Sequence, residues 1–409
     1  MSQSAKVRFG VIGCGGAAWV GHLPWIWDHP DATLEAVCDT DSSSARQAAD
    51  RYQAGAALTD YRKLLDRDDI DAVVIATPPA SHCEIAVAAA QAGKHIMLEK
   101  PMARSVAECD RIAAAARQSG IRLMLGHEKR FSVASQKIRQ LVQRGVLGEV
   151  FYLVVHWGAS VKLCPEKLIP AGYRESYEWR WRDNSTGGGI LQDHVPHYVD
   201  LWRWWTGAEV ESVCAEVQHV ARDYLGRPEI GQLEDFGTVL MRFTNGAVAV
   251  FNTGTVGRGL SPIQHLGSGI GEWSEFGYLY GTRGQLTFDF LPWDSPENGR
   301  LMVWSLEKEQ GSDRGWYQVE LPEPRRSPGG PRSPVTNESF MFRRQMDHFI
   351  AAIQMGAEPA VTAADGRATL AVVEAVYESH RTGQKVRVQQ QQKGDHHGNT
   401  LPGAIARPE

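Results

Sequence analysis

Three ionisable side chains have the types and spacing that proton-transfer chemistry needs. Asp193 and His197 stand four residues apart in a segment with a helical pattern, so both side chains share one face. A carboxylate beside an imidazole can fix the orientation of the ring and stabilise its protonated form. A helical salt bridge without chemistry has the same spacing, and the pair alone does not distinguish the two.

Lys100 is the third of these side chains. It stands in the triplet Glu99-Lys100-Pro101, directly after an apolar run at 95–98 that is typical of a buried strand. At the carboxyl end of a parallel strand, a lysine projects into the ligand crevice of the sheet. Burial and nearby positive charge lower the pKa of a lysine toward a range useful for acid–base catalysis. The triplet by itself is not specific.

The elements around Lys100 alternate between strand and helix. Strands are expected at 6–12, 34–38, 72–76, 95–98 and 123–125, and helices at 43–53, 82–92 and 106–119, the first with Ser42 or Ser43 as its N-cap. Short turns join them, which is typical of a doubly wound parallel sheet. We therefore predict an α/β fold in which residues 1–126 form a dinucleotide-binding Rossmann domain.

A glycine-rich turn follows the first strand and opens a helix. Its sequence is Gly13-Cys14-Gly15-Gly16-Ala17-Ala18, a GxGxxA pattern at the position that a dinucleotide-binding βαβ unit requires. Gly13 permits the tight turn, and Gly15 lets the backbone approach a pyrophosphate. The helix start then offers free N–H groups to the phosphates. An ordinary tight turn is the less specific interpretation.

Asp39 ends the second strand, where a carboxylate can accept hydrogen bonds from the adenosine ribose hydroxyls. It would also repel a 2′-phosphate, and the next residues are Thr40 and Asp41 instead of an arginine. We therefore predict NAD as the cofactor, in preference to NADP. The alternative is that Asp39 only caps a turn. Thr77 and Pro78 follow the third strand and are expected to border the same cofactor.

After residue 127 the pattern changes. Helices are expected at 135–144, 190–206, 338–355 and 364–381, and several strands lie between 150 and 306. They predict an α+β domain at 127–388 with a large, mostly antiparallel open sheet, and the helix at 338–355 is expected to pack back on the first domain. Residues 389–409 are expected to form a disordered tail. An uncovered open sheet would expose an apolar patch, so we predict a homodimer or homotetramer that buries it.

Four motifs, taken in order along the chain, resemble one family. They are GxGxxA at 13–18, ATPPASH at 76–82, EKP at 99–101 and GGGILQDHVPH at 187–197. Over roughly residues 6–380 the chain resembles the glucose–fructose oxidoreductase / inositol dehydrogenase / MocA (Gfo/Idh/MocA) family. The resemblance implies that Lys100, Asp193 and His197 are catalytic. It also places Gly16, Ala17, His82, Glu99 and Lys100 beside the cofactor. Val195 stands where the family usually has glycine, which is expected to reshape the pocket.

The resemblance implies an NAD-dependent oxidoreductase that acts on a sugar, glycoside or polyol. A hydride would leave a ring carbinol, with C3 of a pyranoside favoured, while His197 takes the hydroxyl proton and Lys100 hydrogen-bonds the developing alkoxide. Which of Lys100 and His197 is the formal base stays open. One alternative is an NAD-dependent glycoside hydrolase that oxidises C3 transiently, eliminates the aglycone, adds water and reduces the ketone again. A second is a non-catalytic NAD-sensing protein.

Cationic and aromatic side chains lie near the expected cleft. The segment 127–130 begins the second domain, and the irregular stretch 163–186 precedes the glycine triplet. So many cations suit a carboxylate, sulfonate or phosphate on the sugar, as in a sulfosugar. The plainer interpretation pairs them with Glu166, Glu175 and Glu178. The expected substrate contacts are His127, Lys129, Arg130, Lys162, Tyr173, Arg174, Trp179, Arg180, Arg182 and His194.

Bulk composition argues against several other classes of protein. The formal net charge of −5 gives no reason to expect a nucleic-acid or membrane-surface partner. The six cysteines are scattered without a CxxC pair, and the histidines form no HExxH motif, so we predict no metal site. The segment 1–8 is polar and lacks the apolar core of a secretion signal, so a cytoplasmic location is expected.

Overall fold

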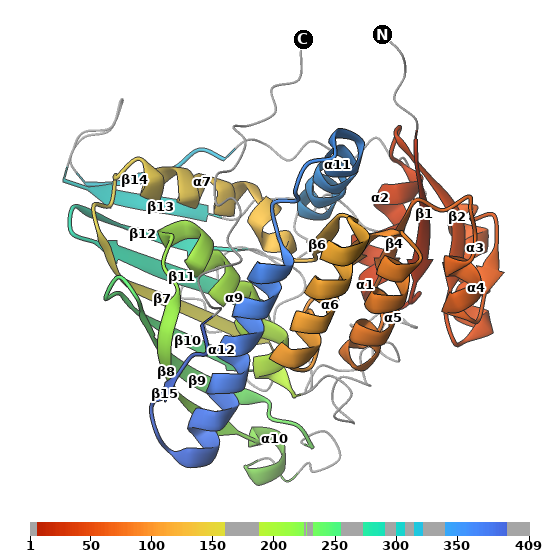
Figure 1. Cartoon of the computed structure of the whole chain (residues 1–409). Coiled ribbons are helices and arrows are strands. Elements are labelled where there is room, and N and C mark those ends of the chain that lie inside the picture. The colour runs from red at the N-terminus through yellow and green to blue at the C-terminus, as the bar shows by residue number, and fades with distance from the viewer. Residues whose placement is uncertain are drawn as a thin grey trace.

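A computed structural model describes residues 6–159, 188–224, 226, 232–254, 273–290, 300–306, 315–321 and 340–390. Two sheets lie side by side in it, a smaller one flanked by helices and a larger one with helices α9 and α12 on one face (Figure 1). The predicted tail lies outside the described residues from 391 on, and so does the Pro/Arg-rich stretch at 322–334.

The smaller sheet is parallel throughout and confirms the predicted Rossmann arrangement. Its order is β3-β2-β1-β4-β5-β6, in which the direction of winding reverses beside β1 and β4. The carboxyl ends of these two strands therefore border the expected ligand crevice. The strands are β1 (Val7–Ile12), β2 (Ala32–Cys38), β3 (Ala57–Leu58), β4 (Ala72–Ile75), β5 (His95–Leu98) and β6 (Leu123–Leu125).

The helices of this domain follow the predicted pattern, with short additions and one correction. The strand β3, the helices α2 and α4 and the turn η1 were not predicted, because such short elements carry no readable period. The predicted N-cap of α3 was wrong: Asp41 caps it, and its carboxylate accepts hydrogen bonds from the backbone N–H groups of Ser43 and Ser44. The helices are α1 (Gly16–Gly21), α2 (Leu23–Trp27), α3 (Ser42–Tyr52), α4 (Tyr61–Leu65), α5 (Pro79–Gln91), α6 (Val106–Ser119) and the 3-10 turn η1 (Glu128–Phe131).

The larger sheet confirms the predicted large, mostly antiparallel sheet. Across the described residues its order is β14-β13-β12-β11-β7-β10-β9-β8-β15, and neighbours pair antiparallel except β7 and β10. Side chains alternate between a buried face and an open one, as a sheet covered on one side requires. The strands are β7 (Val150–Ala159), β8 (Val210–Gln218), β9 (Phe236–Phe243), β10 (Val248–Gly254), β11 (Trp273–Gly281), β12 (Gly284–Asp289), β13 (Arg300–Ser305), β14 (Gly315–Gln318) and β15 (Val386–Arg387).

The buried face of this sheet packs against a long helix, α9 (Ile190–Thr206). Trp202 and Tyr198 on this helix are fully buried against Phe251 of β10, with ring centroids 6.4 and 5.0 Å from it. These aromatic side chains are core residues. The remaining helices of the domain are α7 (Val133–Gln143), α10 (Val220–Asp223), α11 (Phe340–Met355) and α12 (Ala363–Thr382).

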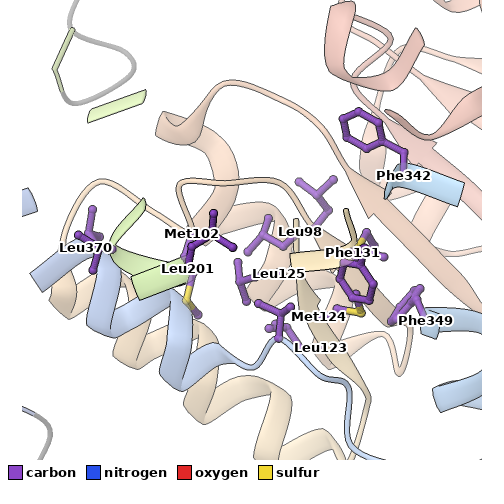
Figure 2. Close-up of a cluster of buried hydrophobic side chains, with 14 of the residues drawn as sticks. Leu98, Met102, Leu123, Met124, Leu125, Phe131, Leu201, Phe342, Phe349 and Leu370 are labelled. Carbon is purple, nitrogen blue, oxygen red and sulfur yellow. The ribbon is translucent and has the colours of Figure 1, made fainter. Parts of the chain in front are cut away.

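Two C-terminal helices tie the domains together. On α11, Phe349 packs on Phe9 of β1, and Asp347 lies 3.0 Å from the imidazole of His29. From α12, the Glu374 carboxylate accepts a hydrogen bond from the backbone N–H of Val106 at 2.7 Å. Figure 2 shows the apolar side of this junction, where Leu98, Leu125, Met102, Leu201, Leu370 and Phe349 gather from both domains. The two domains that border the expected cleft are therefore joined by one continuous hydrophobic core.

A buried network of charges fixes η1 against α9 and α12. The Arg130 guanidinium donates to both carboxylate oxygens of Asp200, at 2.6 and 2.5 Å, and lies 2.9 Å from Asp365. Arg203 lies 3.2 Å from the same Asp365. Each of these four side chains is less than one fifth exposed, so the loss of one partner leaves an uncompensated buried charge.

We expect Arg130→Met to destabilise the protein by about 3–5 kcal/mol, because it strands the Asp200 carboxylate. The measurement is the urea unfolding midpoint, followed by circular dichroism. Arg381→Met is the matched control, since Arg381 pairs with Glu378 on the exposed side of α12; it should leave the midpoint unchanged. Equal midpoints for all three proteins would contradict a stabilising role for the network.

Candidate active site

The glycine-rich turn has the geometry of a phosphate-binding loop. Gly13 has φ of +93°, and a Cβ there would lie 2.6 Å from the carbonyl oxygen of Ala76, so both its conformation and its space require glycine. At Gly15 a Cβ would meet no protein atom within 4 Å. The backbone is therefore open at Gly15, just before α1 begins at Gly16. This is the space that a pyrophosphate needs.

Asp39 links the end of β2 to this turn. Its Oδ2 accepts a hydrogen bond from the backbone N–H of Cys14 at 2.7 Å, and its Oδ1 accepts one from Asp41 at 2.9 Å. The side chain is half-buried, so the carboxylate keeps an accessible side. Asp39 therefore does cap a turn, which was the alternative interpretation of the sequence. Its carboxylate also lies at the end of β2, beside the expected place of the adenosine ribose.

Thr77 and Pro78 follow β4 at the same edge of the sheet, but His82 has a structural position. Its ring is fully buried, with Nε2 2.7 Å from the Thr77 carbonyl oxygen and Nδ1 2.9 Å from that of Pro101. It therefore bridges the loops after β4 and β5. Burial lowers the pKa of His82, although the two carbonyl groups act against this. We assign this histidine to positioning the loops.

Glu99 is buried beneath the same edge and positions the residue that follows it. Its Oε1 lies 2.7 Å from Nε2 of the buried His22, and its Oε2 accepts a hydrogen bond from the backbone N–H of Lys100 at 3.1 Å. Burial disfavours the charged form, but the hydrogen bond from His22 and the charge of Lys100 outweigh it and lower the pKa of Glu99. The ionised Glu99 carboxylate therefore orients the backbone of Lys100.

The side chain of Lys100 reaches from the first domain to a residue of the second domain. The peptide between Lys100 and Pro101 is cis. The ammonium Nζ lies 2.5 Å from Oδ1 of Asp193 and 3.2 Å from the backbone carbonyl oxygen of the same residue. Its side chain is 12% exposed and that of Asp193 is 24% exposed. The structure thus brings two of the three predicted catalytic residues together as a partly buried ion pair.

The start of α9 is held by a residue that the sequence did not single out. The buried Glu234 accepts hydrogen bonds from the backbone N–H groups of Gly189, at 2.7 Å, and Leu191, at 3.2 Å. It also accepts one from the Tyr377 hydroxyl at 2.6 Å. A Cβ at Gly188 would overlap the Tyr377 hydroxyl, and one at Gly189 would overlap the Glu234 backbone. Gly188 and Gly189 therefore allow Tyr377 and Glu234 to pack closely against the start of α9. This packing positions the helix that carries Asp193 and His197.

His197, one turn further along α9, is nearly inaccessible. Its ring is 4% exposed and lies 6.4 Å from the rings of His194 and His127, measured between centroids. Burial, followed by the charges of Lys100 and Lys129, lowers the pKa of His197 well below its usual value. The imidazole is neutral at pH 7 and can accept a proton. Lys100 contributes to this by keeping a positive charge nearby.

His194 belongs to the same cluster. Its ring packs on Trp157 with the centroids 3.7 Å apart, and its Nδ1 lies 3.9 Å from Oδ2 of Asp193. Burial lowers the pKa of His194 to about 3, so this ring is also neutral. Val195 is fully buried in the core. The valine that stands where the family usually has glycine therefore packs its side chain into the core beside α9.

Glu128 was missed by sequence reasoning. It is 3% exposed, and its Oε1 lies 3.7 Å from Nδ1 of His197. Burial raises the pKa of Glu128 to about 7, opposed by the charge of Lys129. A carboxyl group on a short turn carries no signal in the sequence, because the histidine that it faces is far along the chain.

Two of the predicted substrate cations are engaged inside the protein. Lys129 lies 2.5 Å from Glu275, which also accepts a hydrogen bond from the Tyr198 hydroxyl. Arg130 is held by Asp200, as described above. Both cations are less than one tenth exposed and already compensated, so they support α9. Six further predicted contacts lie outside the described residues: Lys162, Tyr173, Arg174, Trp179, Arg180 and Arg182.

The described residues contain neither a membrane-spanning helix nor a cluster of metal ligands. No helix there is long and apolar enough to cross a bilayer. No group of three or more His, Cys, Asp or Glu side chains is arranged to hold a metal ion in the same part of the chain.

The parallel sheet, the open turn at Gly15 and the Lys100–Asp193 pair together define an NAD-binding oxidoreductase, and comparison with known proteins agrees. The model of an oxidoreductase family with an NAD-binding Rossmann fold matches residues 7–127. The model of that family's C-terminal alpha/beta domain matches residues 139–388. The chain belongs to the Gfo/Idh/MocA oxidoreductase family, as its motifs predicted, and its cofactor is NAD.

Individual relatives span much of the chain. Myo-inositol 2-dehydrogenase of Thermotoga maritima is 26% identical, over 89% of this chain and 93% of its own. Levoglucosan dehydrogenase of Pseudarthrobacter phenanthrenivorans is 27% identical, over 59% of this chain and 66% of its own. Among solved structures, aldose-aldose oxidoreductase from Caulobacter crescentus, complexed with glycerol, is 25% identical with a TM-score of 0.73, covering 93% of this chain and 99% of that one.

We expect Asp39→Ala to weaken NAD binding about 10- to 100-fold, because a hydrogen-bonding carboxylate is lost. NADP binding should weaken less or improve, since the repulsion of its 2′-phosphate is removed. Calorimetric Kd values for both cofactors measure the ratio. Asp31→Ala, just before the other end of β2, is the control and should leave both values unchanged. An unaltered NAD/NADP ratio in Asp39→Ala would contradict the assignment.

Proposed function

We propose that this protein is an NAD-dependent oxidoreductase that removes a hydride from a ring carbinol of a sugar, glycoside or polyol. One observation carries the proposal. The Lys100–Asp193 ion pair and the buried, neutral His197 lie together at the carboxyl edge of the sheet that binds the cofactor. A cation and a proton acceptor are the two groups that alcohol oxidation needs.

The geometry gives each residue a separate task. NAD, when bound, supplies the acceptor for the hydride. His197 takes the hydroxyl proton, because its imidazole is uncharged at neutral pH. Lys100 donates a hydrogen bond to the oxygen on which negative charge develops, and Asp193 holds the ammonium in place. We place the formal base at His197, since Lys100 is already engaged as a cation by a carboxylate.

The substrate class follows from the relatives. The names of the two dehydrogenases describe action on myo-inositol and on levoglucosan, both polyhydroxylated rings. Such rings present a secondary carbinol with hydroxyl neighbours, and His194, whose ring lies 6.4 Å from that of His197, is the candidate to contact them. Both ring nitrogens of His127, the other predicted contact, are fully buried. Within this class we favour oxidation at C3 of a pyranoside.

We expect His197→Asn and Lys100→Met each to lower kcat by roughly 10²–10⁴-fold, because each removes a proton-transfer or charge-stabilising group. NAD affinity should change little in His197→Asn, whose side chain is buried in the second domain. NADH absorbance with a panel of pyranosides and cyclitols measures kcat, and calorimetry measures NAD binding. Full turnover in either variant would contradict the role given to that residue. No turnover of any compound in the panel by the wild-type protein, with NAD still bound, would favour a non-catalytic NAD-sensing protein instead.

A redox-neutral reaction uses the same groups. Transient oxidation at C3 of a glycoside acidifies the proton at C2, after which the aglycone can be eliminated, water added and the ketone reduced again. We expect the net dehydrogenase with neutral or anionic nitrophenyl glycosides: NADH accumulates without nitrophenol release. Nitrophenol released over many turnovers, only when NAD is present and with no net NADH, would establish the glycosidase instead.

The open face of the larger sheet is the expected interface between copies of the chain. Strand register places Leu240, Val250, Val154 and Tyr278 in one apolar row that crosses this face, followed by Thr287 and Met302. Leu240 is 46% exposed, and the others are half-buried. A mostly apolar row on an uncovered sheet favours a partner with the same surface, which makes a symmetric dimer or tetramer.

We expect Tyr278→Glu to convert the oligomer into monomers, because it places a charge in the middle of this row. Sedimentation velocity measures the mass over a range of protein concentrations. The control is Tyr224→Glu, since Tyr224 is 72% exposed just after α10, away from the sheet. A wild-type protein that sediments as a monomer at every concentration would contradict the interface.

A further inference from the structure

Glu128 and His197 present two polar atoms to each other without a bond between them. Oε1 of Glu128 and Nδ1 of His197 are both buried without a hydrogen-bond partner, and they lie 3.7 Å apart. This gap is only about 0.5 Å beyond the usual N–H···O range. A buried carboxyl group without a partner is costly, so a small movement that closes the gap is favoured.

The surroundings isolate this pair from water. Both ring nitrogens of the adjacent His127 are also buried and unpaired. α7 and α11 pack on η1 through Gln136 and His348, which contact Arg130 and Phe131. The ionisable groups that act on Glu128 from the neighbouring elements are Lys129 of η1, Glu99 and Lys100 at the end of β5, and His197 and Tyr198 of α9.

We propose that Glu128 is a positioning residue that holds His197 through Nδ1 and takes up the proton that the substrate loses. This inference rests on the proposed function. When the 3.7 Å gap closes, the Glu128 carboxylate accepts the Nδ1–H of His197, which leaves Nε2 free to accept the substrate proton.

The proton and hydride balance in this scheme. The substrate hydroxyl gives its proton to Nε2 of His197, while the Nδ1 proton passes to Glu128. The C–H bond of the carbinol breaks, and its electron pair leaves with the hydride for the nicotinamide. The products are a ketone, NADH, a neutral imidazole with its hydrogen on Nε2, and a protonated Glu128. After the ketone leaves, the Glu128 proton returns to Nδ1 while Nε2 releases its proton into the cleft, which restores the starting state.

The direction of the pH dependence follows. Burial raises the pKa of Glu128 to about 7. Below that pH the carboxyl group is protonated and donates to Nδ1, so the imidazole carries its hydrogen on Nε2 and cannot act as a base. Oxidation should therefore fall as pH drops through about 7. Reduction of the ketone, which needs the proton, should persist there.

The test compares Glu128→Gln with the wild-type protein. Glutamine keeps the shape but cannot take up a proton, so kcat for oxidation should fall roughly 10²-fold at high pH. The acid limb near pH 7 should disappear, while KM for the substrate and the melting temperature stay close to wild type. Glu234→Gln is the matched control: its buried carboxyl group also has a raised pKa and contacts α9, yet it faces no histidine base. Because Glu234 holds the start of α9, this variant is expected to lower kcat, but it should keep the acid limb near pH 7.

A second measurement needs no substrate. Infrared difference spectra across pH should show a neutral carboxylic C=O band that titrates near pH 7, is absent in Glu128→Gln and shifts in His197→Asn. If the band is observed but no sugar is turned over, the Glu128–His197 pair is supported and only the proposed function is contradicted. Sugar turnover with an unchanged acid limb in Glu128→Gln, or a band insensitive to His197→Asn, would overturn the role of Glu128.

Discussion

The ion pair between Lys100 and Asp193 is the interaction on which the site depends, because it joins the carboxyl edge of the parallel sheet to the long helix of the second domain. Each partner is positioned from its own side. Glu99 and His22 fix the backbone that carries Lys100, and Glu234 fixes the start of the helix that carries Asp193. These two buried carboxylates thus support opposite sides of one ion pair, which joins the edge of the cofactor-binding sheet to α9.

Charge distribution around this pair decides which group can move a proton. The cations Lys129 and Arg130 are matched by Glu275 and Asp200, so they stabilise the fold without adding free charge to the site. Burial, followed by the charges of Lys100 and Lys129, lowers the pKa of His197 well below its usual value. Burial also raises the pKa of Glu128 to about 7. The two groups with shifted pKa values that face each other are therefore His197 and Glu128, beside the Lys100–Asp193 pair.

Local patterns in the sequence were enough to predict the fold and to nominate the proposed catalytic residues. GxGxxA, Asp39 and the EKP triplet sit at strand ends that short-range patterns predict, and Asp193 and His197 are a turn apart on one helix. Glu128 and Glu234 could not be found that way. Glu234 is 45 residues from the glycine whose N–H it binds, and Glu128 lies far from His197 along the chain. Lys129 and Arg130 look like substrate cations in sequence, and only the tertiary fold shows the carboxylates that pair with them.

The central claim is that a hydride passes from a ring carbinol to NAD at this site. The most direct measurement is mass spectrometry of the nicotinamide after incubation with pyranosides or cyclitols that carry deuterium on the ring carbinol carbons. The account predicts deuterium on the reduced nicotinamide with the wild-type protein, and none with Lys100→Met or His197→Asn. Turnover of a labelled sugar with no deuterium on the nicotinamide at any time would contradict it.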